Sequence, residues 1–266
     1  MNIEIVVPIY NAHDVTRRAL QALQQHNQND RVLLINDAST DPRIADLLRQ
    51  VPSHWQQLHH THNQGFVKTA NAGLRHNTGH SVLLNSDTLV SAGWLQRMAE
   101  AIDGVDQLGT ATPWSNNAEI CSIPKTLYNN SVPTDLTAVA HQLHEKHRPS
   151  YPELPTAVGF CMLVTAAAKQ TVGYFDEATF GLGYGEENDY SLRVAQAGLK
   201  NVLVDNCYVA HVGNQSFGER NLRPNAQTMQ RLLQKHPEYG SLVEKFIEND
   251  PLRQLRESIV DKIAAF

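Results

Sequence analysis

The chain has 266 residues, of which 41% are hydrophobic and 18% are charged, and its formal net charge is −5. This length predicts one large domain, or one domain with an appendage, and the composition argues against a mainly disordered chain. Because the net charge is negative, the sequence offers no basic field for a nucleic-acid backbone, and no nucleic-acid partner is expected.

The cysteines and the hydropathy pattern indicate the compartment. Cys121, Cys161 and Cys207 are widely separated and form no CxxC pair, which argues against a disulfide scaffold or a cysteine zinc site and favours a reducing cytosol. The N-terminal sequence lacks a signal-peptide pattern, and no stretch approaches the roughly 20 apolar residues that span a bilayer. We therefore expect a cytoplasmic protein, with a peripheral position at the inner face of the membrane as the alternative.

The first 110 residues alternate between short apolar runs and segments of helical periodicity. The apolar runs predict strands at 3–7, 32–35, 57–59 and 81–84. The intervening segments predict helices over 15–23, 44–48 and 67–74. This alternation predicts βαβ units, and therefore an α/β fold whose mostly parallel central sheet has helices on both faces.

The second half of the chain is less regular. Its predicted elements are loops over 113–135, a helix over 135–148, a central strand over 157–166, a helix from 186 to 198 and a strand over 201–204.

Beyond residue 222 the pattern is helical, with Leu252, Leu255, Ile259 and Phe266 at near-heptad spacing. The simplest interpretation is that this segment packs back onto its own domain. The alternative is that it docks onto a partner, a membrane surface or a further domain of a longer chain.

Polar and aromatic residues follow four of the predicted strands directly. These clusters are Pro8-Ile9-Tyr10-Asn11, Asn36-Asp37, Asn63-Gln64-Gly65 and Asn85-Ser86-Asp87. In open α/β sheets, ligands bind beyond the carboxyl ends of the strands. The four clusters therefore predict a binding site at one edge of the sheet.

Two of these clusters contain groups that could bind a nucleotide base. Alone, Asp37 is typical of a turn aspartate that bonds to its own backbone, and Tyr10 of an aromatic side chain at the rim of a site. Together, at the ends of adjacent strands, they could sandwich a base and accept its imide N–H.

The third candidate group is a pair of potential metal ligands. Asn85-Ser86-Asp87-Thr88 is either a polar turn or the position of a carboxylate that holds a divalent cation bridging a diphosphate. His211 alone would be a structural or surface histidine, one of 13 in the chain. As a nitrogen ligand beside Asp87, it would shift the preference towards Mn²⁺.

An acidic run precedes the predicted helix over 186–198. Glu186, Glu187 and Asp189 either favour the helix dipole or include a general base, raised in pKa by like charges, that deprotonates a hydroxyl. The glycines at 181, 183 and 185 form GxGxG with no clear strand before them, so a dinucleotide fingerprint is not indicated.

Taken in order, six segments resemble the family-2 glycosyltransferases with the GT-A fold. They are Val7-Pro8-Ile9-Tyr10-Asn11, Ile35-Asn36-Asp37-Ala38-Ser39-Thr40-Asp41, Asn63-Gln64-Gly65-Phe66, Leu84-Asn85-Ser86-Asp87-Thr88, Gly185-Glu186-Glu187-Asn188-Asp189 and His211. The resemblance is to the bacterial branch that builds surface polysaccharides, including rhamnosyl- and galactofuranosyl-transferases. It implies a GT-A domain over 1–217 and a C-terminal helical extension over 218–266.

The resemblance also implies roles for individual positions. Asp87 matches the last member of the metal-binding DxD motif, His211 the third ligand position, and Glu187 the catalytic base. Pro8, Tyr10 and Asp37 match positions that hold the base, and residues 114–117 are the expected acceptor loop. The full set of expected substrate contacts is Pro8, Tyr10, Asn11, Asp37, Asn63, Gly65, Lys68, Asn85, Ser86 and Trp114.

Two positions depart from the family pattern. Asn85 stands where DxD has its first aspartate, which weakens the metal assignment. Glu187 replaces an aspartate and moves the carboxylate by one methylene, so Glu186 and Asp189 remain candidate bases.

The implied activity is inverting transfer of a hexosyl or deoxyhexosyl group from a UDP- or dTDP-sugar to a growing bacterial surface glycan such as O-antigen. Its implied partners are the nucleotide-sugar donor, a glycan or lipid-linked glycan acceptor, and Mn²⁺ or Mg²⁺. One alternative is a catalytically silent nucleotide-sugar-binding or scaffold module of a larger polysaccharide-synthesis protein. Another, a nucleotidyltransferase, would need a glycine- and arginine-rich loop that residues 10–14 do not provide.

Overall fold

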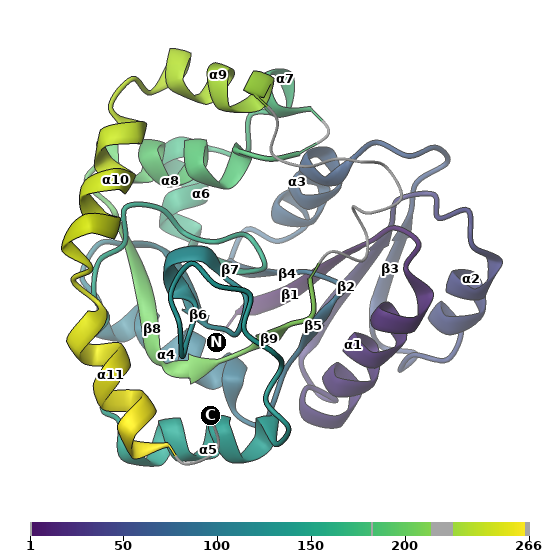
Figure 1. Ribbon diagram of the computed structural model, residues 1–266. Helices are drawn as coiled ribbons and strands as arrows, with labels where there is room; N and C mark the ends of the chain where they lie inside the picture. The colour runs from purple at the N-terminus through teal and green to yellow at the C-terminus, as the bar shows by residue number, and fades with distance from the viewer. Residues whose placement is uncertain (1, 182, 214–225, 264–266) are drawn as a thin grey trace.

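A seven-stranded sheet forms the centre of the molecule (Figure 1). The structure is a computed structural model that describes residues 2–181, 183–213 and 226–263. The strands lie in the order β3-β2-β1-β4-β7-β6-β8, and neighbours are parallel except where β7 pairs with β4 and β6. Their bounds are β1 Ile3–Ile9, β2 Arg31–Asn36, β3 Gln56–His59, β4 His80–Leu84, β6 Leu108–Trp114, β7 Cys161–Val164 and β8 Lys200–Tyr208.

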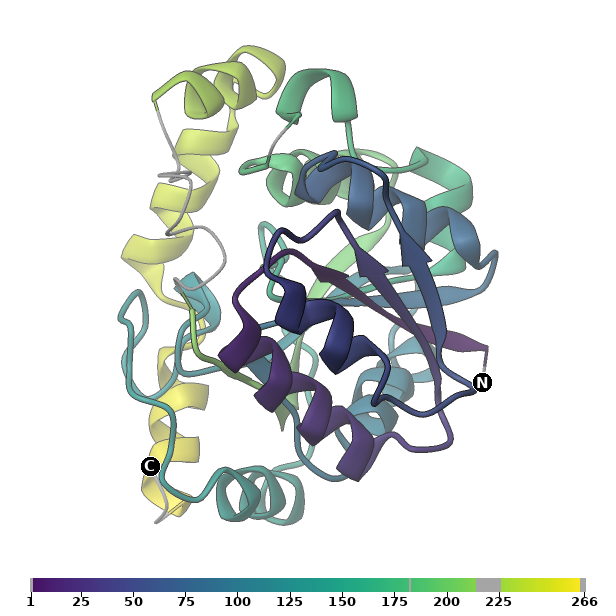
Figure 2. The same cartoon turned by 90° about the vertical axis from the view of Figure 1, so that its right-hand side faces the viewer.

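Helices cover both faces of this sheet (Figure 2). One face carries α1 His13–His26, α2 Pro42–Leu48, α4 Trp94–Gly104, α5 Leu136–Lys146 and α11 Arg253–Lys262. The other carries α3 Phe66–His76, α6 Ala166–Val172, α7 Glu177–Phe180, α8 Glu186–Gln196 and α9 Ala226–Lys235. The helix α10 Tyr239–Asn249 joins the two sets. The predicted α/β fold with a mostly parallel sheet is confirmed.

Strand β1 is apolar at every position except Glu4. Successive side chains of a strand point to opposite faces of the sheet. Ile5 and Val7 accordingly lie in one hydrophobic core and Val6 in the other, each with 0% of its surface exposed. A strand buried on both faces favours apolar residues on both sides, and the buried Glu4 is paired with Arg31 and His76. Such a strand provides a rigid base for the loops at its end.

A small antiparallel ribbon stands beside the main sheet. It consists of β5 Thr88–Leu89 and β9 Ala210–His211, with Thr88 opposite His211. The pairing joins the turn after β4 to the segment after β8, so it brings together two regions far apart in the chain.

Residues 94–114 form α4 and β6, although the sequence analysis assigned no element to them. Strand β6 was missed because its sequence, LGTATPW, has no aliphatic run. Gly109 is required there, since an added Cβ would lie 2.3 Å from Cγ1 of Val194. Pro113 is tolerated because the pairing with β8 shifts register at that point.

The C-terminal helices pack against the rest of the molecule. Leu252 and Ile259 are each 1% exposed in the core that α1 covers, and Leu232 is buried in the opposite core. This arrangement agrees with the simplest interpretation of the tail. Phe266 and the expected domain boundary at 217/218 lie outside the described residues. Within the described chain, every helix is too short or too polar to cross a bilayer.

We expect Ile259→Ala to lower the free energy of unfolding by about 2–4 kcal/mol, because it leaves a cavity between α11 and the core. Urea denaturation measures this change. Ile247→Ala on α10 is the matched control, since Ile247 is 38% exposed and should lose less than about 1 kcal/mol. Equal losses in the two variants would show that α11 does not depend on this core contact.

Candidate functional site

The carboxyl ends of β1, β2 and β4 lie side by side, because these strands are parallel neighbours. Tyr10 and Asn11 follow β1, Asp37 follows β2, and Asp87 lies in the turn after β4. The structure therefore brings the sequence-predicted clusters to one edge of the sheet.

Asp37 organises the loop before α3. It is 3% exposed, and its Oδ1 accepts hydrogen bonds from the Gln64 backbone N–H at 2.8 Å and pairs with His60 Nδ1 at 2.8 Å. Its Oδ2 accepts the Gly65 N–H at 2.9 Å. Asp37 thus bonds to the backbone of a distant loop and not, as the turn interpretation predicts, to the backbone of its own turn. Its contact with a base stays a prediction.

Asn11 connects the turn after β1 to the turn after β2. Its side-chain Oδ1 accepts the backbone N–H groups of Thr40 at 2.8 Å and Asp41 at 3.1 Å. Its own N–H donates to Ser39 Oγ at 2.9 Å. Asn11 is buried and has a left-handed φ of 53°, so it shapes the edge on which a ligand would rest.

The other expected substrate contacts differ in accessibility. Pro8, Tyr10, Asn63 and Asn85 are half-buried and Lys68 is exposed, so each has surface that a ligand could reach. Gly65 and Ser86 are buried within their turns. Trp114 lies in the hydrophobic core with 0% exposure, and its side chain offers no surface to an acceptor. The expected contact of Trp114 therefore has no support from the structure.

Backbone hydrogen bonds fix the turn that carries Asp87. The Asn85 N–H donates to the Phe160 carbonyl at 2.9 Å, and the Thr88 hydroxyl donates to the Asn85 carbonyl at 2.8 Å. The Asp87 carbonyl accepts the Val212 N–H at 2.9 Å. Asp87 itself is 6% exposed.

His211 faces Asp87 from strand β9. Its Nε2 lies 3.4 Å from Asp87 Oδ1, and its Nδ1 lies 2.8 Å from the Asn117 carbonyl. The ring stacks on Phe160, with centroids 5.2 Å apart. Because a carbonyl only accepts, Nδ1 carries a proton and Nε2 is directed at Asp87, as in histidines that bind metals through Nε2.

The donors around Asp87 suit a divalent cation. Burial lowers the pKa of His211, but Asp87 and the Asn117 carbonyl outweigh this effect and raise it above its usual value. A cation bound here would therefore displace a proton shared by His211 and Asp87. In the described part of the chain, no group of three or more His, Cys, Asp or Glu residues could hold a metal. Diphosphate oxygens and water would have to supply the remaining ligands, which is common for Mg²⁺ and Mn²⁺.

The acid pair, Glu186 and Glu187, stands at the first turn of α8. Oε2 of both residues is buried and has no hydrogen-bond partner within the described residues. Burial, and then the charge of Glu187, raise the pKa of Glu186 well above its usual value. Burial, and to a lesser extent Glu119, raise the pKa of Glu187, although the backbone N–H groups of the helix start oppose this. Burial is therefore the larger cause of both raised pKa values and like charge the smaller one, and the role of a base stays a prediction.

Asp189 lies one turn further along α8 and has a different environment. It is 0% exposed, and its carboxylate pairs with Arg193 Nε at 2.9 Å, Lys235 Nζ at 2.7 Å and His236 Nε2 at 2.9 Å. These partners occupy the carboxylate and join α8 to α9. The acid pair therefore differs from Asp189 in having oxygens that are still available.

Residues 159 and 160 connect the metal-ligand pair to the acid pair. Phe160 stacks on His211, and its carbonyl holds the turn of Asp87. A methyl group placed on Gly159 would lie 3.7 Å from Cγ of Glu187. Sequence analysis missed these two residues because only the fold gives them a role. Asn116 and Asn117, expected in an acceptor loop, instead hold His211.

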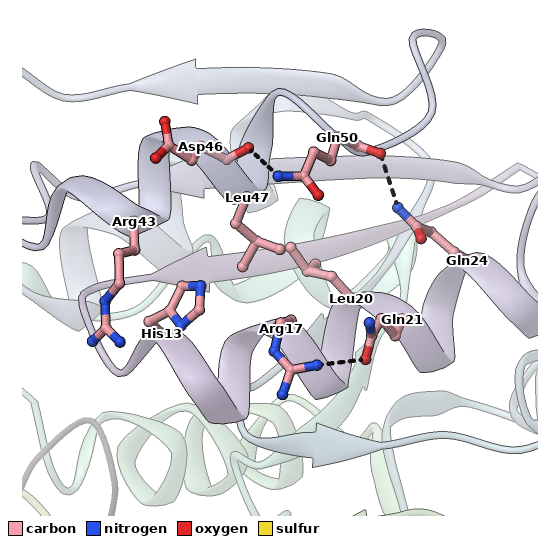
Figure 3. Close-up of a pocket in the computed structure, with 9 residues that line it drawn as sticks. All are labelled: His13, Arg17, Leu20, Gln21, Gln24, Arg43, Asp46, Leu47 and Gln50. Atoms are coloured by element: carbon pink, nitrogen blue, oxygen red, sulfur yellow. Dashed lines mark hydrogen bonds between the residues drawn. The ribbon is translucent and has the colours of Figure 1, made fainter.

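A separate groove lies between α1 and α2 (Figure 3). Leu20 and Leu47 meet at its floor, and His13, Arg17 and Arg43 stand around it. It is lined by none of the expected site residues, and it is a crevice between two packed helices.

We expect Glu186→Gln to change how stability depends on pH. A glutamate with a raised pKa in the folded state keeps its proton there while the unfolded chain ionises, so its contribution is full below about pH 4.5 and is lost as pH rises towards the folded pKa. The wild type should therefore lose up to about 1.4 kcal/mol per pH unit relative to the variant across that window.

Urea denaturation from pH 4 to pH 8 measures this difference. Glu257→Gln, which changes an exposed glutamate on α11, should show no such trend. A difference between wild type and Glu186→Gln that is independent of pH would contradict the buried environment of the acid pair.

Residues 4–120 match the model of the family described as Glycosyl transferase family 2. No curated protein sequence matches the chain. The solved structure of GalNAc-T7 with UDP, GalNAc and Mn²⁺ has a TM-score of 0.65 and 13% identity, covering 90% of this chain and 48% of that one. PcManGT, a mannosyltransferase from Pyrobaculum calidifontis in complex with GDP-Man and Mn²⁺, has a TM-score of 0.59 and 13% identity. The match covers 92% of this chain and 75% of that one. The S. aureus TarS structure of residues 1–349 has a TM-score of 0.54 and 14% identity. The match covers 98% of this chain and 88% of that one.

At these identities the likeness concerns the fold. The chain spans about half the length of GalNAc-T7. The predicted GT-A fold is confirmed by the sheet, its flanking helices and their likeness to these structures. The family match covers residues 4–120, less than half of the chain, and the likeness to the solved structures extends the GT-A fold over most of it.

Proposed function

We propose that the protein is an inverting glycosyltransferase that moves a hexosyl or deoxyhexosyl group from a UDP- or dTDP-sugar to a hydroxyl of a growing bacterial surface glycan. One observation carries the proposal: residues 159 and 160 join a potential metal-ligand pair to a buried acid pair at the carboxyl edge of the sheet. A glycosyl transfer from a diphosphate donor needs both charge neutralisation and a base.

The similar structures support the kind of donor. GalNAc-T7 was solved with UDP, GalNAc and Mn²⁺, and PcManGT with GDP-Man and Mn²⁺. In this chain, the half-buried Tyr10 and the turn organised by Asp37 would receive the nucleoside. Lys68, exposed on the first turn of α3, is available to a phosphate.

Asp87 and His211 would hold the divalent cation. When bound, this cation would neutralise the negative charge that develops on the leaving diphosphate. The protein's own contribution is to orient the two ligands. The Asn117 carbonyl sets the histidine tautomer, and the Val212 N–H and the β5–β9 pairing hold the Asp87 turn.

Glu187 would act as the base. Its carboxylate takes the proton of the acceptor hydroxyl while that oxygen forms a bond to the anomeric carbon. The bond from that carbon to the donor phosphate breaks on the opposite face, and its electron pair leaves with the diphosphate, so the configuration inverts. The raised pKa of Glu187 makes its ionised form a better proton acceptor, and the donors around Asp189 make that residue the poorer candidate.

For the acceptor we propose a glycan or lipid-linked glycan, with a cytoplasmic position for the enzyme and peripheral contact with the inner face of the membrane through the C-terminal helices. Exposed apolar side chains on α9 and α10 support this contact. They are Met229, Leu233, Leu242 and Ile247.

The proposed function predicts that the protein releases nucleoside diphosphate from a sugar nucleotide in the presence of Mn²⁺ and acceptor. A thermal-shift screen of UDP-, dTDP- and GDP-sugars selects the donor, and a coupled assay measures release. In this assay, Glu187→Gln should lower kcat by about 10²-fold or more and leave donor binding unchanged, because the base is lost while the donor site stays intact.

The pH profile tests the same residue. Because the carboxylate must be ionised, wild-type activity should fall as pH decreases through a value above the usual pKa of glutamate. Glu257→Gln is the control for the substitution. Full activity in Glu187→Gln would refute the base assignment, and donor binding without any release would favour a silent binding module.

Asp87→Ala should weaken Mn²⁺-dependent binding of the nucleoside diphosphate by about tenfold or more, because it removes the carboxylate of the ligand pair. Calorimetry with and without Mn²⁺ measures the effect, and addition of EDTA to the wild type should reproduce it. Asp46→Ala, at an exposed site on α2, is the control. The same Mn²⁺-dependent affinity in Asp87→Ala and wild type would exclude Asp87 as a ligand.

A further inference from the structure

The helix α9 lies directly against the helix that carries the acid pair. Figure 1 shows α9 beside α7 and α8, at the far end of the molecule from α5. Leu232 on α9 is 1% exposed and belongs to the core that α8 covers. Arg231 donates to the Thr179 carbonyl on α7 at 3.0 Å. A segment beyond the family-matched residues 4–120 therefore forms one wall of the region that contains Glu186 and Glu187.

Asp189 is the centre of the contact between these helices. Its Oδ1 accepts from Lys235 Nζ at 2.7 Å and pairs with His236 Nε2 at 2.9 Å, while its Oδ2 accepts from Arg193 Nε at 2.9 Å. Lys235 also reaches Asp176 Oδ2 at 2.8 Å. A fully buried carboxylate is stable only when such donors neutralise it, so α8 depends on α9 for two of its three partners.

The contacts of His236 determine which ring nitrogen donates. Its Nδ1 lies 3.4 Å from Gln196 Nε2, and an amide nitrogen can only donate. The proton therefore sits on Nε2, which donates to Asp189. His236 is 3% exposed, so this orientation is held by packing as well.

The same helix also packs on the turn that begins the acid pair. Gly185 precedes Glu186 with a left-handed φ of 93°, and a Cβ added there would lie 3.0 Å from Phe180 Cε1 and 3.9 Å from Leu232 Cδ2. The Asp189 N–H donates to the Gly185 carbonyl at 2.9 Å. The network and the acid pair thus share one helical turn. In it Glu186 and Asp189, three residues apart, lie on the same side, whereas Glu187 is linked to Asp189 through the helix backbone.

The start of α10 lies near the acid pair as well. Tyr239 packs against the core that α8 covers. Burial, together with the nearby charges of Glu187 and Glu119, raises the pKa of Tyr239 to about 12. Two separate parts of the C-terminal segment therefore reach the helix start where Glu186 and Glu187 stand.

We infer that His236 and Lys235 are positioning residues of the active site, which act through Asp189 to hold α8 and its acid pair in place. The C-terminal helices would then complete the catalytic unit. This inference rests on the proposed function, because it assigns a purpose to the acid pair. It adds that the position of the base is set by the C-terminal helices.

The inference predicts a change in kcat without a change in donor affinity. Lys235→Met and His236→Leu should each lower kcat by about tenfold, because they release the helix that carries Glu187, and leave the KM for the donor within about twofold. His236→Gln should retain most of the activity, since its amide can still donate to Asp189. Lys262→Met is the matched control, because Lys262 is an exposed lysine in the same C-terminal segment.

The pH profile separates positioning from a loss of stability. Without Lys235, the negative charge of Asp189 is less neutralised and opposes ionisation of Glu186 and Glu187. Among the described residues, Glu119 and Tyr239 are the other charged or titratable groups that act on this pair. The acid limb of the kcat profile should therefore move up by about half a pH unit or more in Lys235→Met, which a general loss of stability would not cause.

All variants are compared below their melting temperatures, measured by circular dichroism. If His236→Leu does not fold, Lys235→Met decides the outcome alone, since that side chain is 33% exposed. If Lys235→Met has the same kcat and the same acid limb of the pH profile as Lys262→Met, the inference is overturned while the proposed function stands. A wild type that turns over none of the donors would instead refute the proposed function.

Discussion

The pairing of two very short strands holds the candidate site together. β5 and β9 place Thr88 opposite His211, so Asp87 meets a histidine from a distant part of the chain. Asn116 strengthens this junction, because its side chain bonds to both the N–H and the carbonyl of His211. The Asn117 carbonyl then orients the ring. The geometry of the ligand pair thus depends on the pairing of the ribbon and on the side chain of Asn116.

The acid pair imposes a second constraint, since it concentrates buried carboxylates at the start of one helix. Oε2 of Glu186 and of Glu187 has no partner among the described residues, and burial of such groups costs free energy. One turn along, Asp189 is also buried, but Arg193 and the two donors of α9 neutralise it. In the part of the chain that the structure describes, helix α8 thus carries carboxylate oxygens without partners at Glu186 and Glu187, where chemistry is proposed. At Asp189, where it meets α9, the carboxylate oxygens are all hydrogen-bonded.

The strands of the first half could be predicted because strands buried on both faces require continuous apolar runs. The edge of the sheet that carries the site followed from the same pattern, since parallel neighbours end together. Strand β6 could not be predicted, because Gly109 and Pro113 occur there for tertiary reasons. The burial of Trp114 could not be predicted from the sequence either, because it was expected to contact the substrate and yet lies in the core. Asp189 and Glu187 belong to one acidic run, and their partners distinguish them: Arg193, Lys235 and His236 neutralise Asp189.

Different forces hold the two pairs of candidate functional side chains. A backbone hydrogen bond to Asp87, the Asn116 side chain and the Asn117 carbonyl fix Asp87 and His211, and these contacts are local to the sheet edge. The position of Glu186 and Glu187 depends on packing between Gly185 and Leu232 and on the ion pairs of Asp189. A donor and its cation would therefore meet a rigid surface, whereas the base stands on a helix supported by the C-terminal segment. If the proposed function holds, changes in the C-terminal segment would therefore act on the acceptor side of the reaction and leave the donor side unchanged.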